Sequence, residues 1–135
     1  MKKRTARLIP LLLLAGSIVS GCATGRQLQA VDLPALNGHW EGHWQEGGQQ
    51  APLTLEISAV TPTSATGSQT WFKTFSGDMT TTFSGRFENG KLIHDWGGGA
   101  HVTFDRYNPE TRELWGATRG RRGGEGTVYL KKQAR

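Results

Sequence analysis

The first residues that suggest chemistry are His39, Glu41 and His43, three side chains of metal-binding type at every second position. In an extended strand alternate residues point to the same side, so all three share one face. An adjacent pair, about 6.6 to 7 Å apart, could hold an ion, but the two histidines are about 13 Å apart and cannot share it. We therefore expect a solvated outer face here and no metal site.

The intervening positions of the same stretch carry large aromatic rings. Trp40 and Trp44 point to the opposite face, with Gly42 between them. The glycine leaves room for side chains that arrive from the far side of a small closed interior. This pattern indicates a strand that lines a β-barrel.

A second group with chemical potential is the basic, glycine-rich segment from 119 to 124. Its arginines, Arg119, Arg121 and Arg122, could clamp a phosphate, a sulfate or an anionic sugar such as the core of lipopolysaccharide. Such a segment is more often a solvated hairpin tip, and that is the simpler interpretation.

Sequence motifs of catalysis are missing. The chain has no Gly-x-Ser-x-Gly elbow, phosphate-binding loop or metalloprotease helix, and no spacing assembles a nucleophile, a base and an orienting group. The best candidate for general-base chemistry is His94, which would need a buried carboxylate partner that the sequence does not identify. We therefore expect neither an enzyme nor a cofactor.

The elements that position these residues are strands. Nineteen glycines, many Thr, Val and aromatic residues, and no apolar period of 3.6 residues beyond the first 21 positions predict an all-β domain. Eight strands are expected, at 38–45, 52–60, 65–73, 79–88, 91–96, 100–106, 112–118 and 125–131. Short connections join them in order, so the predicted fold is an eight-stranded antiparallel up-and-down barrel, which leaves no exposed edge.

The best-defined hairpin turns at Asn89-Gly90, a strong signal for a type I′ turn. Its register pairs Phe87 with Leu92 and Gly85 with His94 on the inner face. The glycines at 97–99 are expected to form a three-residue loop, and the third strand does not define its own register. The remaining inner-face positions are predicted to be Phe83, Trp96, Ala100, Val102, Phe104, Leu114, Gly116, Val128 and Leu130, with Trp115 outside.

The start of the chain has the features of a signal peptide, with a basic beginning, an apolar run and small residues over positions 1–21. Its end, Val19-Ser20-Gly21-Cys22, resembles the lipobox of bacterial lipoproteins. The resemblance implies cleavage before Cys22 and acylation of that residue with chains such as palmitate, so that the partner of this end is a lipid bilayer. Ala23 implies sorting to the outer membrane, facing the periplasm.

The predicted domain organisation follows from this. Residues 1–21 form the signal peptide, 22–37 the lipidated cysteine and a tether, and 38–135 the barrel domain. The signal holds four of the 16 Lys and Arg residues, so the mature chain has 12 against 11 Asp and Glu, a net charge of +1. A nucleic-acid partner is therefore not expected, and the single cysteine excludes a disulfide framework.

The opening of the first barrel strand adds a second resemblance. Asn37-Gly38-His39-Trp40 is similar to the Gly-x-Trp of the calycins, the lipocalin and avidin group. In that group the tryptophan packs under a basic residue of the last strand, and the resemblance places Lys131 in this position. A small bacterial metalloprotease-inhibitor barrel with the same opening is an equally good relative.

The alternation of connections in such a barrel gathers its longer, glycine-rich loops at one end, which we take as the mouth. The leading hypothesis is a lipoprotein that binds a small hydrophobic or anionic ligand there. The candidate ligand-binding residues are Trp40, Trp44, His94, Trp96, Arg119, Arg121 and Arg122, and the inward glycines 42, 85 and 116 leave space. The simpler interpretation of the interior is a filled core around a hydrogen-bonded histidine.

Two further functions stay open. The loops could instead bind an envelope protein, as in an inhibitor of a protease or lysozyme or an envelope assembly factor. An enzyme of cyclase or isomerase type that uses His94 is a third hypothesis.

Overall fold

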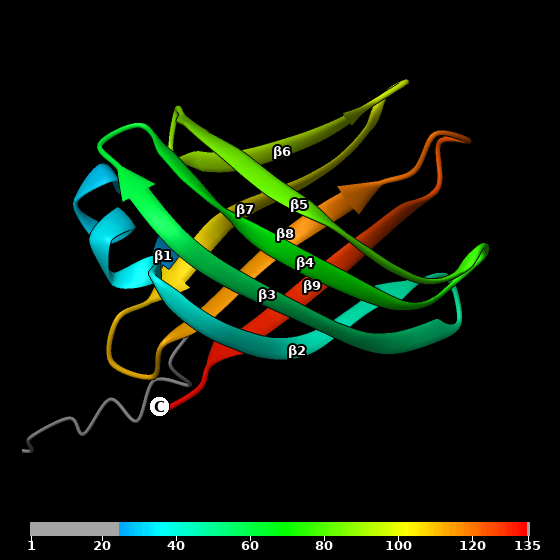
Figure 1. Cartoon of the computed structure of the whole chain (residues 1–135), viewed down its shortest axis with the longest axis horizontal. Helices are drawn as coiled ribbons and strands as arrows, with labels where there is room; N and C mark the ends of the chain where they lie inside the picture. The colour runs from blue at the N-terminus through cyan, green and yellow to red at the C-terminus, as the bar shows by residue number, and fades with distance from the viewer. Residues whose placement is uncertain (1–24, 135) are drawn as a thin grey trace, which may run out of the picture.

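The computed structural model describes residues 25–134, and the signal peptide and Cys22 lie outside this range. Eight of its strands form a closed antiparallel barrel in which each strand pairs with the next and the last pairs with the first (Figure 1). The strands of the barrel are β2 (Gly38–Glu46), β3 (Gln49–Thr61), β4 (Ser64–Thr74), β5 (Gly77–Glu88), β6 (Lys91–Gly97), β7 (Ala100–Asn108), β8 (Glu113–Arg119) and β9 (Glu125–Lys132). The predicted all-β, up-and-down barrel is confirmed. No helix of residues 25–134 is long and apolar enough to span a membrane.

The predicted hairpin between β5 and β6 is confirmed, with Phe87 opposite Leu92 and Gly85 opposite His94. The next turn differs from the prediction, because Gly97 pairs with Ala100 and leaves a two-residue turn of Gly98 and Gly99, both with positive φ. A bulge between Asp95 and Gly97 absorbs the extra residue. Ala100 therefore still points inward, as predicted.

The inner face forms one apolar core. Trp40, Phe83 and Leu114 are fully buried, and Trp115 lies on the outer wall as predicted. The third strand, whose register the sequence left open, turns Gln69 and Trp71 inward, and both are buried. The buried apolar side chains are Leu28, Leu33, Leu36, Trp40, Trp44, Ala51, Leu53, Leu55, Ile57, Ala65, Trp71, Phe83, Leu92, Ala100, Val102, Phe104, Tyr107, Leu114, Val128 and Leu130.

The segment before the barrel corrects the predicted tether. Its short strand β1 (Arg26–Gln27) pairs with the last part of β7, which extends past the residues that pair with β6. The 3-10 helix η1 (Ala30–Leu36) follows. Leu28, Leu33 and Leu36 are all at most 1% exposed and belong to the barrel core. Figure 1 shows η1 at one end of the barrel. Residues 25–37 therefore plug this end, because an open barrel end would expose its apolar lining to water.

An ion pair fastens the plug. Both terminal nitrogens of Arg26 lie 2.7 Å from the carboxylate oxygens of Asp32, which also accepts a hydrogen bond from the backbone N–H of Gln29. The Arg26 guanidinium lowers the pKa of the Asp32 carboxyl, against the opposing effect of burial. A buried carboxylate is thus kept charged beside a bidentate partner.

The inward glycines do not leave the free space that was expected. A methyl group on Gly42 would lie 1.8 Å from the carbonyl oxygen of Tyr129, and one on Gly116 would lie 1.9 Å from that of Thr103. At Gly85 the side chains of Leu92 and Phe83 already fill the space, at 2.9 Å. Gly42 and Gly116 thus permit close approach of neighbouring strands in a narrow barrel.

The basic residue beside Trp40 is Lys132, which corrects the assignment of Lys131. Lys132 is the residue of β9 opposite Trp40, and its Nζ donates a 2.8 Å hydrogen bond to the carbonyl of Ala35 in η1. Lys131 is exposed and lies opposite Glu113. The pairing of β2 with β9 puts Leu130 inward, so Lys132 and not its neighbour shares that side of the strand.

Candidate functional site

One end of the barrel is plugged, and the other carries the longest turn, residues 120–124 between β8 and β9, with three two-residue turns beside it. The turns between β2 and β3, β4 and β5, β6 and β7, and β8 and β9 all meet at the end opposite η1 (Figure 1). This end corresponds to the mouth expected from the sequence. It is where a ligand can enter.

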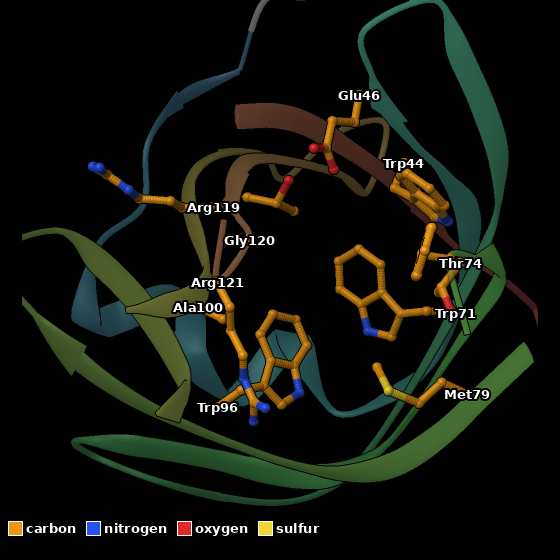
Figure 2. Close-up of a pocket in the computed structure, with 12 residues that line it drawn as sticks. Trp44, Glu46, Trp71, Thr74, Met79, Trp96, Ala100, Arg119, Gly120 and Arg121 are labelled. Carbon is orange, nitrogen blue, oxygen red and sulfur yellow. The ribbon is translucent and has the colours of Figure 1, made fainter. Parts of the chain in front are cut away.

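A pocket of about 340 Å³ lies in the mouth (Figure 2). Its wall is formed largely by Trp44, Trp71, Trp96 and Met79, from four different strands. Its other lining residues are Glu46, Thr74, Phe75, Ala100, Thr118, Arg119, Gly120 and Arg121. The barrel is thus filled by side chains towards η1 and hollow towards the mouth.

The three tryptophans of the pocket form a connected cluster. The ring of Trp71 lies 6.3 Å from that of Trp44 and 5.3 Å from that of Trp96, the second pair edge to face. The indole N–H of Trp44 donates to the carbonyl of Phe72 at 3.0 Å, and that of Trp71 donates to Oε1 of Gln69 at 2.9 Å. These bonds fix two of the rings, so the wall of the pocket is formed before any ligand arrives.

His94 lies beneath the pocket, only 7% exposed. Its ring stacks on Phe83 at 5.3 Å and meets Trp96 edge to face at 5.0 Å. The pairing of β5 with β6 ends at His94. Beyond this point the Nδ1 atom of His94 lies 2.9 Å from the backbone nitrogen of Ser84 and 3.1 Å from its carbonyl oxygen. Because a backbone N–H can only donate, the closer contact favours an Nδ1 that accepts and an Nε2 that carries the proton.

Two ring nitrogens under the pocket have no partner among residues 25–134. They are Nε2 of His94 and Nε1 of Trp96, both shielded from solvent. A buried N–H group without a hydrogen bond costs free energy. The floor of the pocket therefore holds two N–H groups that lack a hydrogen-bond acceptor.

The three predicted arginines lie in different places. Arg121 reaches across the mouth beside Trp96, whereas the side chain of Arg119 points away from the pocket (Figure 2). The guanidinium of Arg122 lies over the ring of Phe75, 5.4 Å from its centroid, and Phe75 is 97% exposed at the rim. Arg119 and Arg121 both line the pocket, but of these two only Arg121 extends its side chain across it.

The other candidates divide between the pocket and the core. Trp44 and Trp96 line the pocket, and His94 lies one layer below. Trp40 lies outside it, fully buried near the plug, where its indole N–H donates to the carbonyl of Leu36 at 2.8 Å. Trp40 lies nearer to the plug along β2 than Trp44, so Trp40 belongs to the core and Trp44 to the pocket.

Sequence reasoning missed Trp71 and Met79 as pocket residues. Their strands carry polar residues at inward or neighbouring positions, which hid the alternation. Gln69 is the clearest case, because it is buried and both atoms of its side-chain amide are hydrogen-bonded. The nitrogen donates to the carbonyl of Thr82, and the oxygen accepts from the indole N–H of Trp71. The signal that could have found Trp71 is the pairing of β4 with the well-defined inner face of β3.

Of the two outward histidines of β2, His39 is hydrogen-bonded to neighbouring carboxylates, whereas His43 contacts the ring of Tyr129. Nδ1 of His39 lies 2.9 Å from Oε2 of Glu56, and Nε2 lies 3.0 Å from Oε1 of Glu41. The Glu41 carboxylate, followed by that of Glu56, raises the pKa of His39. Across positions 25–134 no three His, Cys, Asp or Glu residues come close enough together to hold a metal ion.

No protein-family model, no curated protein and no solved structure matches the chain. What the mouth can bind is therefore inferred from its side chains. Indole rings, a thioether and one overhanging guanidinium can enclose a flat apolar molecule and pair with an anionic group at its edge.

Proposed function

We propose that this protein is a lipid-anchored binding protein that holds one compact aromatic molecule, preferably with an anionic group, in the mouth of its barrel. The observation that carries the proposal is the cluster of Trp44, Trp71 and Trp96 around a pocket of about 340 Å³ in an otherwise filled barrel. Apolar walls with few polar groups are typical of small-molecule sites.

The size of the pocket restricts the ligand. At about 340 Å³ it is at the small end of ligand sites. Side chains and the plug fill the barrel below it, so a long acyl chain has no room to extend. One or two fused rings, stacked among the indoles with a carboxylate towards Arg121, match this shape.

The anchor belongs to the same proposal and is supported by the sequence. The lipobox Val19-Ser20-Gly21-Cys22 favours acylation of Cys22, and Ala23 favours the outer membrane with the domain on the periplasmic side. Residue 25 lies at the plugged end of the barrel, so the mouth opens at the end away from the anchor.

Binding is favoured over catalysis. A general base at His94 would need a carboxylate beside it, but the one buried carboxylate among residues 25–134, Asp32, is paired with Arg26 in the plug. His94 Nδ1 is already engaged by Ser84. These contacts support a structural role for His94 under the binding site.

The first test is native mass spectrometry of the protein purified gently from its own host. A small co-purifying mass that is lost on denaturation is the expected result. Titration of tryptophan fluorescence follows, with 2-naphthoate, the neutral 2-naphthalenemethanol and palmitate as probes. Saturable quenching by the two naphthalenes and none by palmitate is expected, and no saturable response to any compact aromatic would contradict the proposal.

Variants locate the site. Trp71→Leu should weaken 2-naphthoate binding about 2- to 10-fold, the effect of one aromatic contact. Arg121→Gln should weaken it up to about 5-fold, the effect of an exposed ion pair, and leave 2-naphthalenemethanol unchanged. The control is Trp115→Phe on the outer wall, which should bind both probes as the unmodified protein does.

A protein partner at the mouth is the second candidate function, favoured by Phe75. This ring is 97% exposed on the rim, with Arg122 over it, and aromatic residues and arginines dominate the energetics of protein interfaces. In a cross-linking capture from the host envelope, Phe75→Ser should abolish recovery of an inhibited enzyme or assembly partner, and Trp71→Leu should not. The opposite pattern would favour the small-molecule proposal.

A further inference from the structure

A row of large side chains crosses the outer wall of the barrel, away from the mouth pocket. The pairing register aligns His43 of β2 with Tyr129 of β9, Tyr129 with Trp115 of β8, and Trp115 with Arg106 of β7. We call these four residues the outer row. They lie side by side because neighbouring strands of a closed barrel place paired residues on the same face.

The rings of the outer row contact one another. The Tyr129 ring lies 5.3 Å from that of His43 and 5.8 Å from that of Trp115. The Tyr129 hydroxyl donates a 2.6 Å hydrogen bond to Glu113, which holds the central ring in place. The three rings are partly exposed and border a hollow of about 590 Å³ that also includes Asp105, Thr127 and Arg106.

Gly25, the residue before β1, lies against this row. A methyl group on Gly25 would lie 2.7 Å from Cζ3 of Trp115 and 2.8 Å from Cγ of Arg106, so residue 25 packs directly against both. Three peptide units separate Gly25 from Cys22, a span of at most about 11 Å. An acyl anchor on Cys22 is thereby tied to the immediate neighbourhood of Trp115.

We propose that the outer row is a membrane-contact surface, which rests on the headgroup region of the bilayer that holds acylated Cys22. The inference rests on the anchor of the proposed function and is independent of the pocket. Tryptophan and tyrosine favour the boundary between water and lipid, because their rings are apolar and their polar groups stay hydrated.

The rings, and not charge, carry this contact. Arg106 and Lys131 on this wall are offset by Asp105 and Glu113, so the wall has little net charge to attract anionic lipid. The contact should therefore form on vesicles of phosphatidylcholine, which have no net charge, and persist in salt that screens surface charge. The barrel would then lie with the wall of β7, β8 and β9 against the membrane.

The experiment compares two walls of the acylated full chain. Thr127→Cys labels the wall of the outer row, and Thr82→Cys labels β5, four strands away on the opposite wall. Both threonines are exposed on outer faces, and acylation of Cys22 leaves the introduced cysteine as the only free thiol. Each variant carries an environment-sensitive fluorophore on phosphatidylcholine vesicles that contain a lipid with a nitroxide headgroup.

We expect blue-shifted emission and strong quenching at position 127, with neither at position 82. Trp115→Glu and His43→Glu should each reduce the quenching at position 127, provided that each variant melts cooperatively. Protein that floats with the vesicles but is quenched equally at both positions would overturn the membrane-contact surface and leave the anchor intact. Protein that does not float would overturn the anchor and the surface together, and 2-naphthoate binding tests the pocket separately.

Discussion

Replacement of Leu33 by alanine tests whether residues 25–37 belong to the folded domain. Leu33 is 0% exposed in η1 and is part of the barrel core. Truncation of a fully buried leucine removes its transfer free energy and leaves a cavity, so Leu33→Ala should lower the free energy of unfolding by about 2 to 5 kcal/mol. At about 4 °C per kcal/mol for a domain near 100 residues, the melting temperature should fall by roughly 8 to 20 °C.

The matched control lies two residues away. Val31 belongs to the same 3-10 helix but is 76% exposed, so Val31→Ala should change stability by no more than about 0.5 kcal/mol. Thermal unfolding followed by circular dichroism and urea unfolding followed by tryptophan fluorescence measure both variants. If Leu33→Ala melts within 2 °C of Val31→Ala, about the control's own limit, then the plug is not part of the cooperative unit and a tether is the correct description.

Three other predictions follow from contacts in the barrel. The pKa of Asp32 is lowered in the fold, so its ion pair stabilises the protein above the unfolded pKa of about 4. This stabilisation is lost as the pH falls through the lower, folded pKa. The difference in unfolding free energy between Asp32→Asn and the unmodified protein should therefore be largest near neutral pH and shrink in acid. The Glu113 carboxylate raises the pKa of Tyr129 to about 12, and in a spectrophotometric titration Glu113→Gln should bring one tyrosine back towards about 10. Gly42→Ala forces β2 away from β9 and should cost about 1 to 3 kcal/mol in urea unfolding, whereas Gly48→Ala, with no atom within 4 Å, should be nearly neutral; equal stability of the two would refute the close approach.

The strands could be predicted because their signals are local. Alternation in β2 and the Asn89-Gly90 turn each fix which side chains point inward, and one fixed hairpin sets the register of its neighbours. The bulge at Asp95 was not visible in the sequence, yet it preserved the predicted inward position of Ala100. Strand bounds and inner faces therefore followed closely from the residues.

The candidate site was predicted only in part. Trp44 and Trp96 were found from their alternation, but Trp71 was missed because the inward Gln69 beside it looks like a solvent position. Gln69 can be buried only because its amide meets partners from another strand. The direction of Arg119, away from the pocket, likewise depends on the register of β8 in the closed barrel.

The residues alone predict an all-β chain of eight hairpin-linked strands, its inward and outward faces, and a lipid anchor. Each of these depends on residues close together in the chain. The folded barrel was needed to show that residues 25–37 plug one end, that Lys132 and not Lys131 meets η1, and that the hollow part of the barrel lies among the tryptophans of the mouth. These outcomes depend on which surfaces remain uncovered after the barrel closes, and that is set by contacts between residues far apart in the chain.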